Sequence, residues 1–179
     1  MTILTVGHST RPIDEFLGLL RGHGVRRLVD VRTVPRSRHN PQFNADALAA
    51  SLGGAGIAYV HLPGLGGLRH PRPDSINTAW RNRSFRGYAD HMQSAAFADA
   101  LQRCLELAAD GPVALMCAEA VPWRCHRSLI ADALIARGIE PREIVSPSVS
   151  RPHTLTPFAK VSGTDVAYPA PGSERLPGT

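Results

Sequence analysis

The sequence contains few cysteines, almost no lysine and no long run of apolar residues. Cys104, Cys117 and Cys125 are its three cysteines, too few for a disulfide framework, so a reducing compartment is expected. No stretch approaches the roughly 18 consecutive apolar residues of a membrane helix. The first residues lack the charged and apolar regions of a signal peptide. These absences predict a cytoplasmic protein with no membrane partner.

The motifs of several cofactor and metal sites are also absent. Cys117 and Arg124 are one residue too far apart for the loop of a cysteine-dependent phosphatase. The glycine-rich run at 64–67 is not followed by a helix with the third glycine that a dinucleotide site requires. Cys117, Cys125 and His126 lack the short paired spacings of a structural zinc site. We therefore expect neither a metal nor a cofactor.

The composition that remains is typical of one loop-rich domain. The chain has 179 residues, of which 43% are hydrophobic and 20% charged, with 16 glycines and 15 prolines. That length allows a sizeable hydrophobic core. We expect a single domain over residues 1–169 and a flexible tail over 170–179.

Apolar periodicity predicts alternating strands and helices. Strands are expected at 3–6, 28–31, 57–61, 113–116 and 143–145, and helices at 13–20, 44–52, 88–109 and 126–137. Short apolar strands separated by helices are typical of a parallel sheet covered on both faces. The predicted fold is therefore α/β, a three-layer α/β/α sandwich with a mostly parallel five-stranded sheet. Residues 62–87 are expected to form a long loop.

Arginine is concentrated in two of the loops. The net charge is +5, and of the 20 basic residues only Lys160 is a lysine. Residues 32–43 and 69–88 hold a clear excess of arginine over acidic residues. A GC-rich genome would explain the general abundance of arginine, but not its concentration in two loops. Because guanidinium groups bind phosphate and carboxylate in bidentate geometry, these stretches predict anion binding.

Polar residues follow the predicted strands at one edge of the sheet. In open parallel sheets, ligands bind beyond the carboxyl ends of the strands. The first strand leads into residues 8–11, the second into 32–38 and the fourth into 117–119. We expect these segments to form one site with the start of the last helix. The expected anion-binding residues are Arg32, Arg38, Arg127, Ser9 and Ser37.

The segment from Met116 to Arg127 carries the most reactive side chains. Cys125 lies where a helix is expected to begin, and there the helix dipole and the neighbouring basic residues would stabilise a thiolate. Cys125 or Cys117 is the candidate nucleophile, and a buried structural thiol is the alternative for each. Cys104 lies on the apolar face of a predicted helix and is expected to fill the core.

Acid–base groups accompany these cysteines. His126 or His8 would carry a proton, and Glu119 would orient a partner or act as a base. The alternative for His8 and for Glu119 is a purely structural contact. Asp30 lies in an apolar strand, where a buried carboxylate needs a basic partner, so we expect it to organise the site, with Glu119 facing the same cluster. The expected partner of this carboxylate is one of Arg127, Arg32 and His8.

Two main functions are consistent with these residues. The first is a small enzyme that acts on an anionic substrate, with a thiolate as nucleophile or redox group. The second is a nucleic-acid-binding protein that uses the two arginine-rich loops and stacks bases on Trp80, Phe85 and Tyr88. Those rings could instead anchor a lid to the core, and a regulatory module for a small ligand is a third possibility. The expected partner is an anionic small molecule or a nucleic acid, and the oligomeric state is not predicted.

An ordered set of motifs resembles one protein family along nearly the whole chain, to about Pro169. The motifs are Thr5-Val6-Gly7-His8-Ser9-Thr10, Leu28-Val29-Asp30-Val31-Arg32 with Pro35 and Ser37, Leu65-Gly66-Gly67, Gly87-Tyr88, Met116-Cys117-Ala118-Glu119, Cys125-His126-Arg127, and Pro152-His153 with Leu155-Thr156-Pro157-Phe158. They resemble the family of the domain of unknown function 488. The resemblance implies a compact cytoplasmic α/β domain and brings no established reaction. It also suggests that the segment around His153 belongs to the domain and returns to the site.

Overall fold

Six strands form one sheet in the computed structural model, which describes residues 1–173. Their order across the sheet is β3 (Ala58–His61), β2 (Arg27–Asp30), β4 (Val113–Cys117), β1 (Ile3–Gly7), β5 (Arg142–Ile144) and β6 (Ser150–Pro152). All neighbours are parallel except β6, which runs antiparallel to β5. This confirms the predicted α/β fold with a mostly parallel sheet. The additional strand β6 was not predicted, because its three residues are polar or proline and largely exposed.

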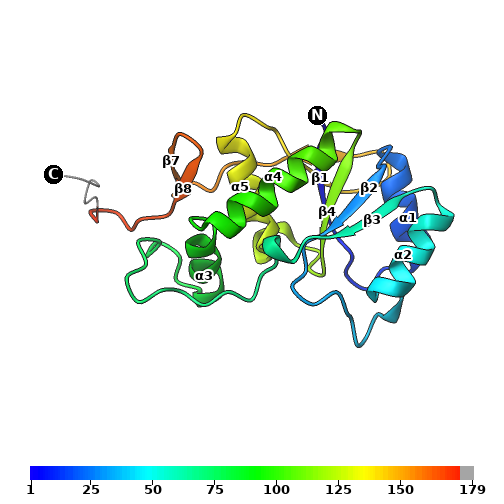
Figure 1. Cartoon of the computed structure of the whole chain (residues 1–179), viewed down its shortest axis with the longest axis horizontal. Helices are drawn as coiled ribbons and strands as arrows, with labels where there is room; N and C mark the ends of the chain where they lie inside the picture. The colour runs from blue at the N-terminus through cyan, green and yellow to red at the C-terminus, as the bar shows by residue number, and fades with distance from the viewer. Residues whose placement is uncertain (174–179) are drawn as a thin grey trace.

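Helices cover both faces of this sheet (Figure 1). α1 (Ile13–Gly22) and α2 (Ala45–Gly54) pack on one face, and α4 (Ala95–Ala109) and α5 (Arg127–Ala136) pack on the other. The central strand β1 is buried throughout, and its side chains alternate between the two cores: Leu4 and Val6 face α1 and α2, while Ile3 faces α4 and α5. Burial on both faces explains why the strands are apolar runs. The predicted three-layer sandwich is confirmed.

The long helix predicted at 88–109 is wrong, because the structure has two helices there. α3 (Arg83–His91) begins within the predicted loop, where the Asn82 side chain accepts hydrogen bonds from two amides of its first turn. α4 begins after Ser94, whose hydroxyl accepts a hydrogen bond from the Phe97 amide at 3.2 Å. Serine and asparagine are favourable N-caps because they satisfy amides that have no partner within the helix. The cap at Ser94 therefore marks the start of a second helix, separate from α3.

Each helix within residues 1–173 is too short or too polar to span a bilayer.

β1 and β4 lie side by side in the sheet, but the chain leaves them in opposite directions. From β1 it passes through α1 toward β2, whereas from β4 it passes through α5, on the other face, toward β5. Such a reversal opens a crevice at the carboxyl ends of the strands. Gly7 and Cys117 are register partners at the ends of β1 and β4. The predicted meeting of these two strand ends at one edge is confirmed.

The segment after β6 folds back on α5. It forms a hairpin of β7 (Lys160–Ser162) and β8 (Asp165–Ala167) and then places Tyr168 in the core. Asp132 of α5 is fully buried and accepts hydrogen bonds from the Tyr168 hydroxyl at 2.7 Å and from the Thr156 amide at 3.1 Å. This carboxylate therefore anchors the segment to the rest of the fold. Of the predicted tail over 170–179, residues 174–179 lie outside the described part of the chain.

We expect Tyr168→Phe to lower the free energy of unfolding by about 1.5–3 kcal/mol, the usual contribution of a hydrogen bond to a charged group. Urea denaturation measures the change. Val161→Ala, on the exposed hairpin, is the control and should stay within about 0.5 kcal/mol of the wild type. Equally small losses in both variants would show that Asp132 does not anchor this segment.

Candidate active site

Two free thiols meet at the crevice. Cys117 is the last residue of β4, and Cys125 lies between the short 3₁₀ helix η3 (Pro122–Arg124) and α5. Their Sγ atoms are 2.6 Å apart. The side chains are largely buried, with exposed fractions of 2% for Cys117 and 6% for Cys125. The loop between β4 and α5 thus brings together the two cysteines that were predicted as candidate nucleophiles.

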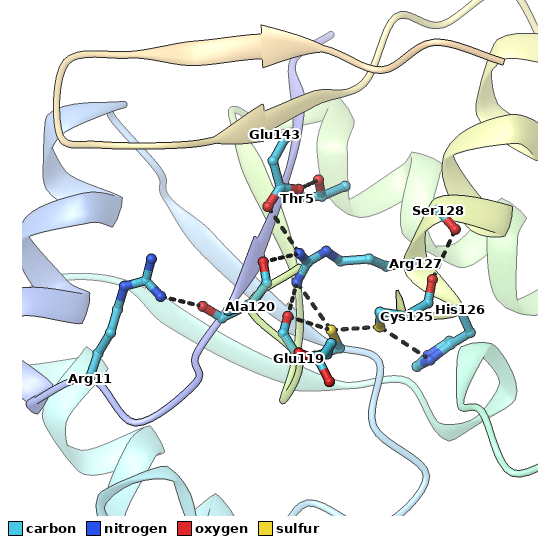
Figure 2. Close-up of polar contacts among 11 residues, drawn as sticks. Thr5, Arg11, Glu119, Ala120, Cys125, His126, Arg127, Ser128 and Glu143 are labelled. Carbon is cyan, nitrogen blue, oxygen red and sulfur yellow. Dashed lines mark hydrogen bonds and ion pairs between the residues drawn. The ribbon is translucent and has the colours of Figure 1, made fainter. Parts of the chain in front are cut away.

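The fully buried guanidinium of Arg127 connects this thiol pair to the next strand (Figure 2). Its Nη1 is 3.1 Å from Cys117 Sγ and donates to the Glu119 carbonyl at 2.9 Å. Its Nη2 donates to the Ala120 carbonyl at 3.1 Å and to Glu143 Oε1 of β5 at 2.9 Å. Arg127 therefore ties together the end of β4, the loop that follows it and β5.

The two thiols have opposite pKa shifts. Burial by itself would raise the pKa of Cys117, but the hydrogen bond from Cys125 and the charge of Arg127 outweigh it, so this pKa is lowered. The hydrogen bond to Cys117 and then burial raise the pKa of Cys125. Cys117 is therefore the cysteine of the pair that ionises first, while Cys125 keeps its proton and donates a hydrogen bond to Cys117.

His126 lies next to Cys125 as a neutral hydrogen-bond acceptor. Its Nε2 is 2.8 Å from the Val31 carbonyl, and because a carbonyl can only accept, Nε2 carries the ring proton. Nδ1 is then an acceptor, 3.5 Å from Cys125 Sγ. Burial lowers the pKa of His126 to about 4, so the ring is neutral near pH 7. His126 is thus a neutral group with an acceptor nitrogen beside Cys125.

A cavity of about 460 Å³ opens onto the thiols, and we call it the first cavity. Three segments contribute most of its wall: the loop after β2, the start of α3, and the turn between β4 and α5. Its lining residues include Arg32, Thr33, Arg36, Asn82, Ser84, Phe85, Tyr88, Cys117, Glu119, Arg124, Cys125 and His126. Arg36 and Arg124 are exposed cations in this wall, and Glu119 is an exposed acid. The wall of the first cavity therefore carries more exposed positive than negative charge.

Four predicted catalytic residues come together in the first cavity: Cys117, Cys125, His126 and Glu119. Its two exposed arginines, Arg36 and Arg124, were not among the predicted site residues. The only sequence signal for Arg36 was its basic loop, and that signal did not distinguish it from Arg38. Only the path of each loop in space shows that Arg36 and Arg124 line the first cavity.

Several other predicted residues lie elsewhere. His8 is buried, stacks on Phe43 with ring centroids 4.2 Å apart, and is bonded through Nδ1 to the Ser9 carbonyl oxygen at 2.8 Å. Burial lowers the pKa of His8. Ser9, Ser37 and Arg38 lie outside the wall of the first cavity. The geometry therefore gives His8 a structural position. Ser9 contacts the wall through its backbone amide, which donates to the Ala118 carbonyl at 3.0 Å, whereas Ser37 and Arg38 lie outside the wall.

The expected anion-binding role of Arg127 is not supported. Its side chain is 0% exposed, and its two terminal nitrogens already bind Glu143, two backbone carbonyls and Cys117, while Nε has no partner among the described residues. The sequence could not show this because an arginine in the first turn of a helix can point outward to solvent or inward. Here it points inward, and Nη1 contacts Cys117 Sγ.

Asp30 is paired as the sequence predicted. Its carboxylate is fully buried and accepts two hydrogen bonds from Arg32, from Nε at 2.9 Å and from Nη2 at 2.7 Å. The Tyr59 hydroxyl also donates to it at 2.7 Å. Arg32 is thus held by Asp30, although its edge reaches the first cavity. Glu119 does not face this cluster as expected: its side chain is exposed at the first cavity.

The segment around His153 reaches the far side of Arg127 and not the thiols. His153 Nε2 is 2.7 Å from Asp132 Oδ1. Together with Arg11, Arg127 and Glu143 it lines a second cavity of about 520 Å³. The segment therefore returns to the Arg127–Glu143 pair, but it does not reach the thiols as the resemblance suggested. Within residues 1–173, no group of three or more His, Cys, Asp or Glu side chains is arranged to hold a metal ion.

The fold and site define a doubly wound α/β domain with an arginine-stabilised thiol pair at its crevice. Residues 12–134 match the family model described as domain of unknown function DUF488. Because this match covers more than half of the chain, the protein belongs to the DUF488 family. No curated protein and no solved structure matches the chain. The family description carries no activity, so function has to be argued from the geometry.

We expect Asp30→Asn to lower the free energy of unfolding by about 3–5 kcal/mol, because it leaves the buried Arg32 without its counter-charge. Chemical denaturation measures the loss. Glu106→Gln breaks the exposed Arg103–Glu106 pair and is the control, with an expected change below about 1 kcal/mol. Similar small losses in both variants would show that the Asp30–Arg32 pair does not hold the site together.

Proposed function

We propose that this protein is an enzyme that acts on an anionic substrate through a cysteine nucleophile, and we assign the nucleophile to Cys117. The observation that carries the proposal is the 3.1 Å contact between Arg127 Nη1 and Cys117 Sγ at the base of the first cavity. A thiolate, not a thiol, is the nucleophilic form of cysteine. The paired guanidinium supplies the charge that keeps Cys117 in that form.

The neighbouring groups supply the other functions that such a reaction needs. Cys125 donates a hydrogen bond to the thiolate and so positions Cys117. His126 is a neutral acceptor beside Cys125. Glu119 is exposed in the wall of the first cavity, where its carboxylate can exchange a proton with a bound substrate. Within this proposal Cys117 is the catalytic residue, and Cys125 and His126 are positioning residues.

Substrate binding is assigned to Arg36 and Arg124. Both are exposed in the wall of the first cavity and come from different segments: Arg36 follows β2 and Arg124 ends η3. Guanidinium groups suit carboxylate and phosphate, and the volume of about 460 Å³ suits a small molecule. We keep the cytoplasm as the expected location, because its reducing environment maintains free thiols.

The geometry favours this enzyme over the nucleic-acid-binding alternative. Trp80 packs on Phe85, Phe158 and Tyr168, with ring centroids 4.9, 4.8 and 5.5 Å apart. Tyr88 is only 1% exposed. Rings that are packed against each other are not free to stack on bases. Nucleic-acid binding stays a prediction, and its test is retention of labelled strands that weakens steeply with salt.

The proposal predicts that Cys117 reacts at a pH where ordinary thiols are still protonated. Iodoacetamide alkylation with peptide mapping should modify Cys117 with a midpoint below about 8.5, the ordinary thiol pKa. Arg127→Met should raise that midpoint by about 1–3 units, since it removes the cation that favours the thiolate. Cys104 is the internal control, because burial raises its pKa to about 12.

A second variant keeps this test decisive where Arg127→Met fails to fold. Cys125→Ala leaves Arg127 and Glu143 in place and removes only the hydrogen bond to the thiolate, so it should also raise the midpoint. The assignment would be contradicted if Cys117 in the folded wild-type protein were alkylated only above about pH 8.5. It would also be contradicted if Cys125 were modified before Cys117.

We also expect inorganic phosphate to slow the alkylation of Cys117, because an anion bound to Arg36 and Arg124 would block the first cavity. Arg36→Ala and Arg124→Ala should each weaken this protection. Arg38→Ala is the matched control, since Arg38 is exposed on the same loop as Arg36 but outside the first cavity. Equal protection in all three variants would show that the anion binds elsewhere.

A further inference from the structure

We propose that Cys117 and Cys125 form a redox-modification site that closes an intramolecular disulfide by exchange with the disulfide of an anionic thiol. The inference rests on the proposed function, because it uses Cys117 as the attacking group. It goes further by assigning the regulation of that group and the chemical class of its oxidant.

The positions of the two sulfur atoms carry the proposal. Cys117 Sγ and Cys125 Sγ are 2.6 Å apart, and both cysteines are free. A disulfide bond is about 2.05 Å long, so the sulfur atoms need to move very little to form one. Cys104 lies on α4 in the hydrophobic core and is 0% exposed. The pairing is therefore specific to the two cysteines of the first cavity.

The exchange proceeds in two steps. In the first, the Cys117 thiolate attacks one sulfur of the incoming disulfide, the bond between its two sulfurs breaks, and one half leaves as a thiolate. In the second, Cys125 gives up its proton to the thiolate released in the first step and attacks Cys117 Sγ. The second half then leaves as a thiolate and takes up a proton from solvent. Two electrons pass from the cysteine pair to the incoming disulfide, which ends as two thiols.

The charge of the first cavity selects the oxidant. Arg36 and Arg124 are exposed in its wall against the single exposed acid Glu119, and Arg32 beside them is neutralised by Asp30. This excess of positive charge attracts a disulfide whose halves carry carboxylates and repels a cationic one. The disulfide of an anionic thiol is therefore the class of oxidant that reaches Cys117 fastest.

Disulfide formation would switch the proposed enzyme off. Oxidation removes the negative charge of Cys117, so Nη1 of Arg127 keeps only the Glu119 carbonyl as a full partner. A sulfur in a disulfide is no longer a nucleophile, and activity returns when a dithiol reduces the bond. The loop between β4 and α5 already holds the two sulfurs together, so the second step requires little movement of the sulfur atoms.

The test exposes the reduced full chain to three disulfides of different charge. Glutathione disulfide is anionic, bis(2-hydroxyethyl) disulfide is neutral and cystamine is cationic. After alkylation, peptide mapping should show a Cys117–Cys125 link, with Cys104 outside it. The rate should fall in the order anionic, neutral, cationic, and salt should reduce the difference. Arg36→Ala and Arg124→Ala should each reduce the advantage of glutathione disulfide several-fold, whereas Arg38→Ala should preserve it.

Cysteine variants separate the two steps. Cys125→Ser should stop the exchange at a mixed disulfide, seen as one glutathione on Cys117, and Cys117→Ser should give neither adduct nor link. Three results would overturn the proposal: a mixed disulfide that persists in the wild type, a disulfide link that involves Cys104, or exchange rates that do not depend on the charge of the added disulfide. If Cys117 alkylates as a thiolate but no link forms, the inference fails and the proposed function stands. If Cys117 behaves as an ordinary thiol, both fail.

Discussion

The site depends on one buried cation, the guanidinium of Arg127. Transferring an unpaired charge into a protein interior costs several kcal/mol, so Arg127 requires acceptors around it. Glu143, two backbone carbonyls and the Cys117 sulfur supply them. Gly7 makes this possible, because a Cβ at this position would lie 1.8 Å from the Glu119 carbonyl oxygen. The proposed reactivity of Cys117 rests on the same arrangement, since its sulfur is one of the partners of the cation.

Much of the fold and the centre of the site could be predicted from the sequence. Apolar strands buried on both faces produce short runs that are easy to recognise, and parallel strands place their carboxyl ends at one edge. That rule brought Cys117 together with the start of α5, and hence with Cys125 and His126. The pairing of Asp30 followed from the cost of burying a carboxylate alone. These predictions needed only local pattern and elementary electrostatics.

The rest depended on contacts between segments distant in the sequence. The inward direction of Arg127 is determined by Glu143 on β5, and β5 is placed beside Thr5 only by the order of the strands. The break at Ser94 was missed because the apolar residues that indicate a helix there lie in α4 alone, and their pattern does not show where α3 ends. Arg36 and Arg38 have the same local character, and only the path of their loop places the former in the first cavity.

The division of charge between the two cysteines is the central claim, and nuclear magnetic resonance of the reduced protein tests it most directly. With cysteine labelled with carbon-13 at Cβ, both site cysteines can be followed in one sample as the pH is varied. The account predicts that the Cys117 signal shows a thiolate well below the pH at which a free thiol ionises, while Cys125 remains a thiol throughout that range. A thiolate signal that appears first at Cys125, or ionisation of both cysteines at the ordinary pKa, would contradict it.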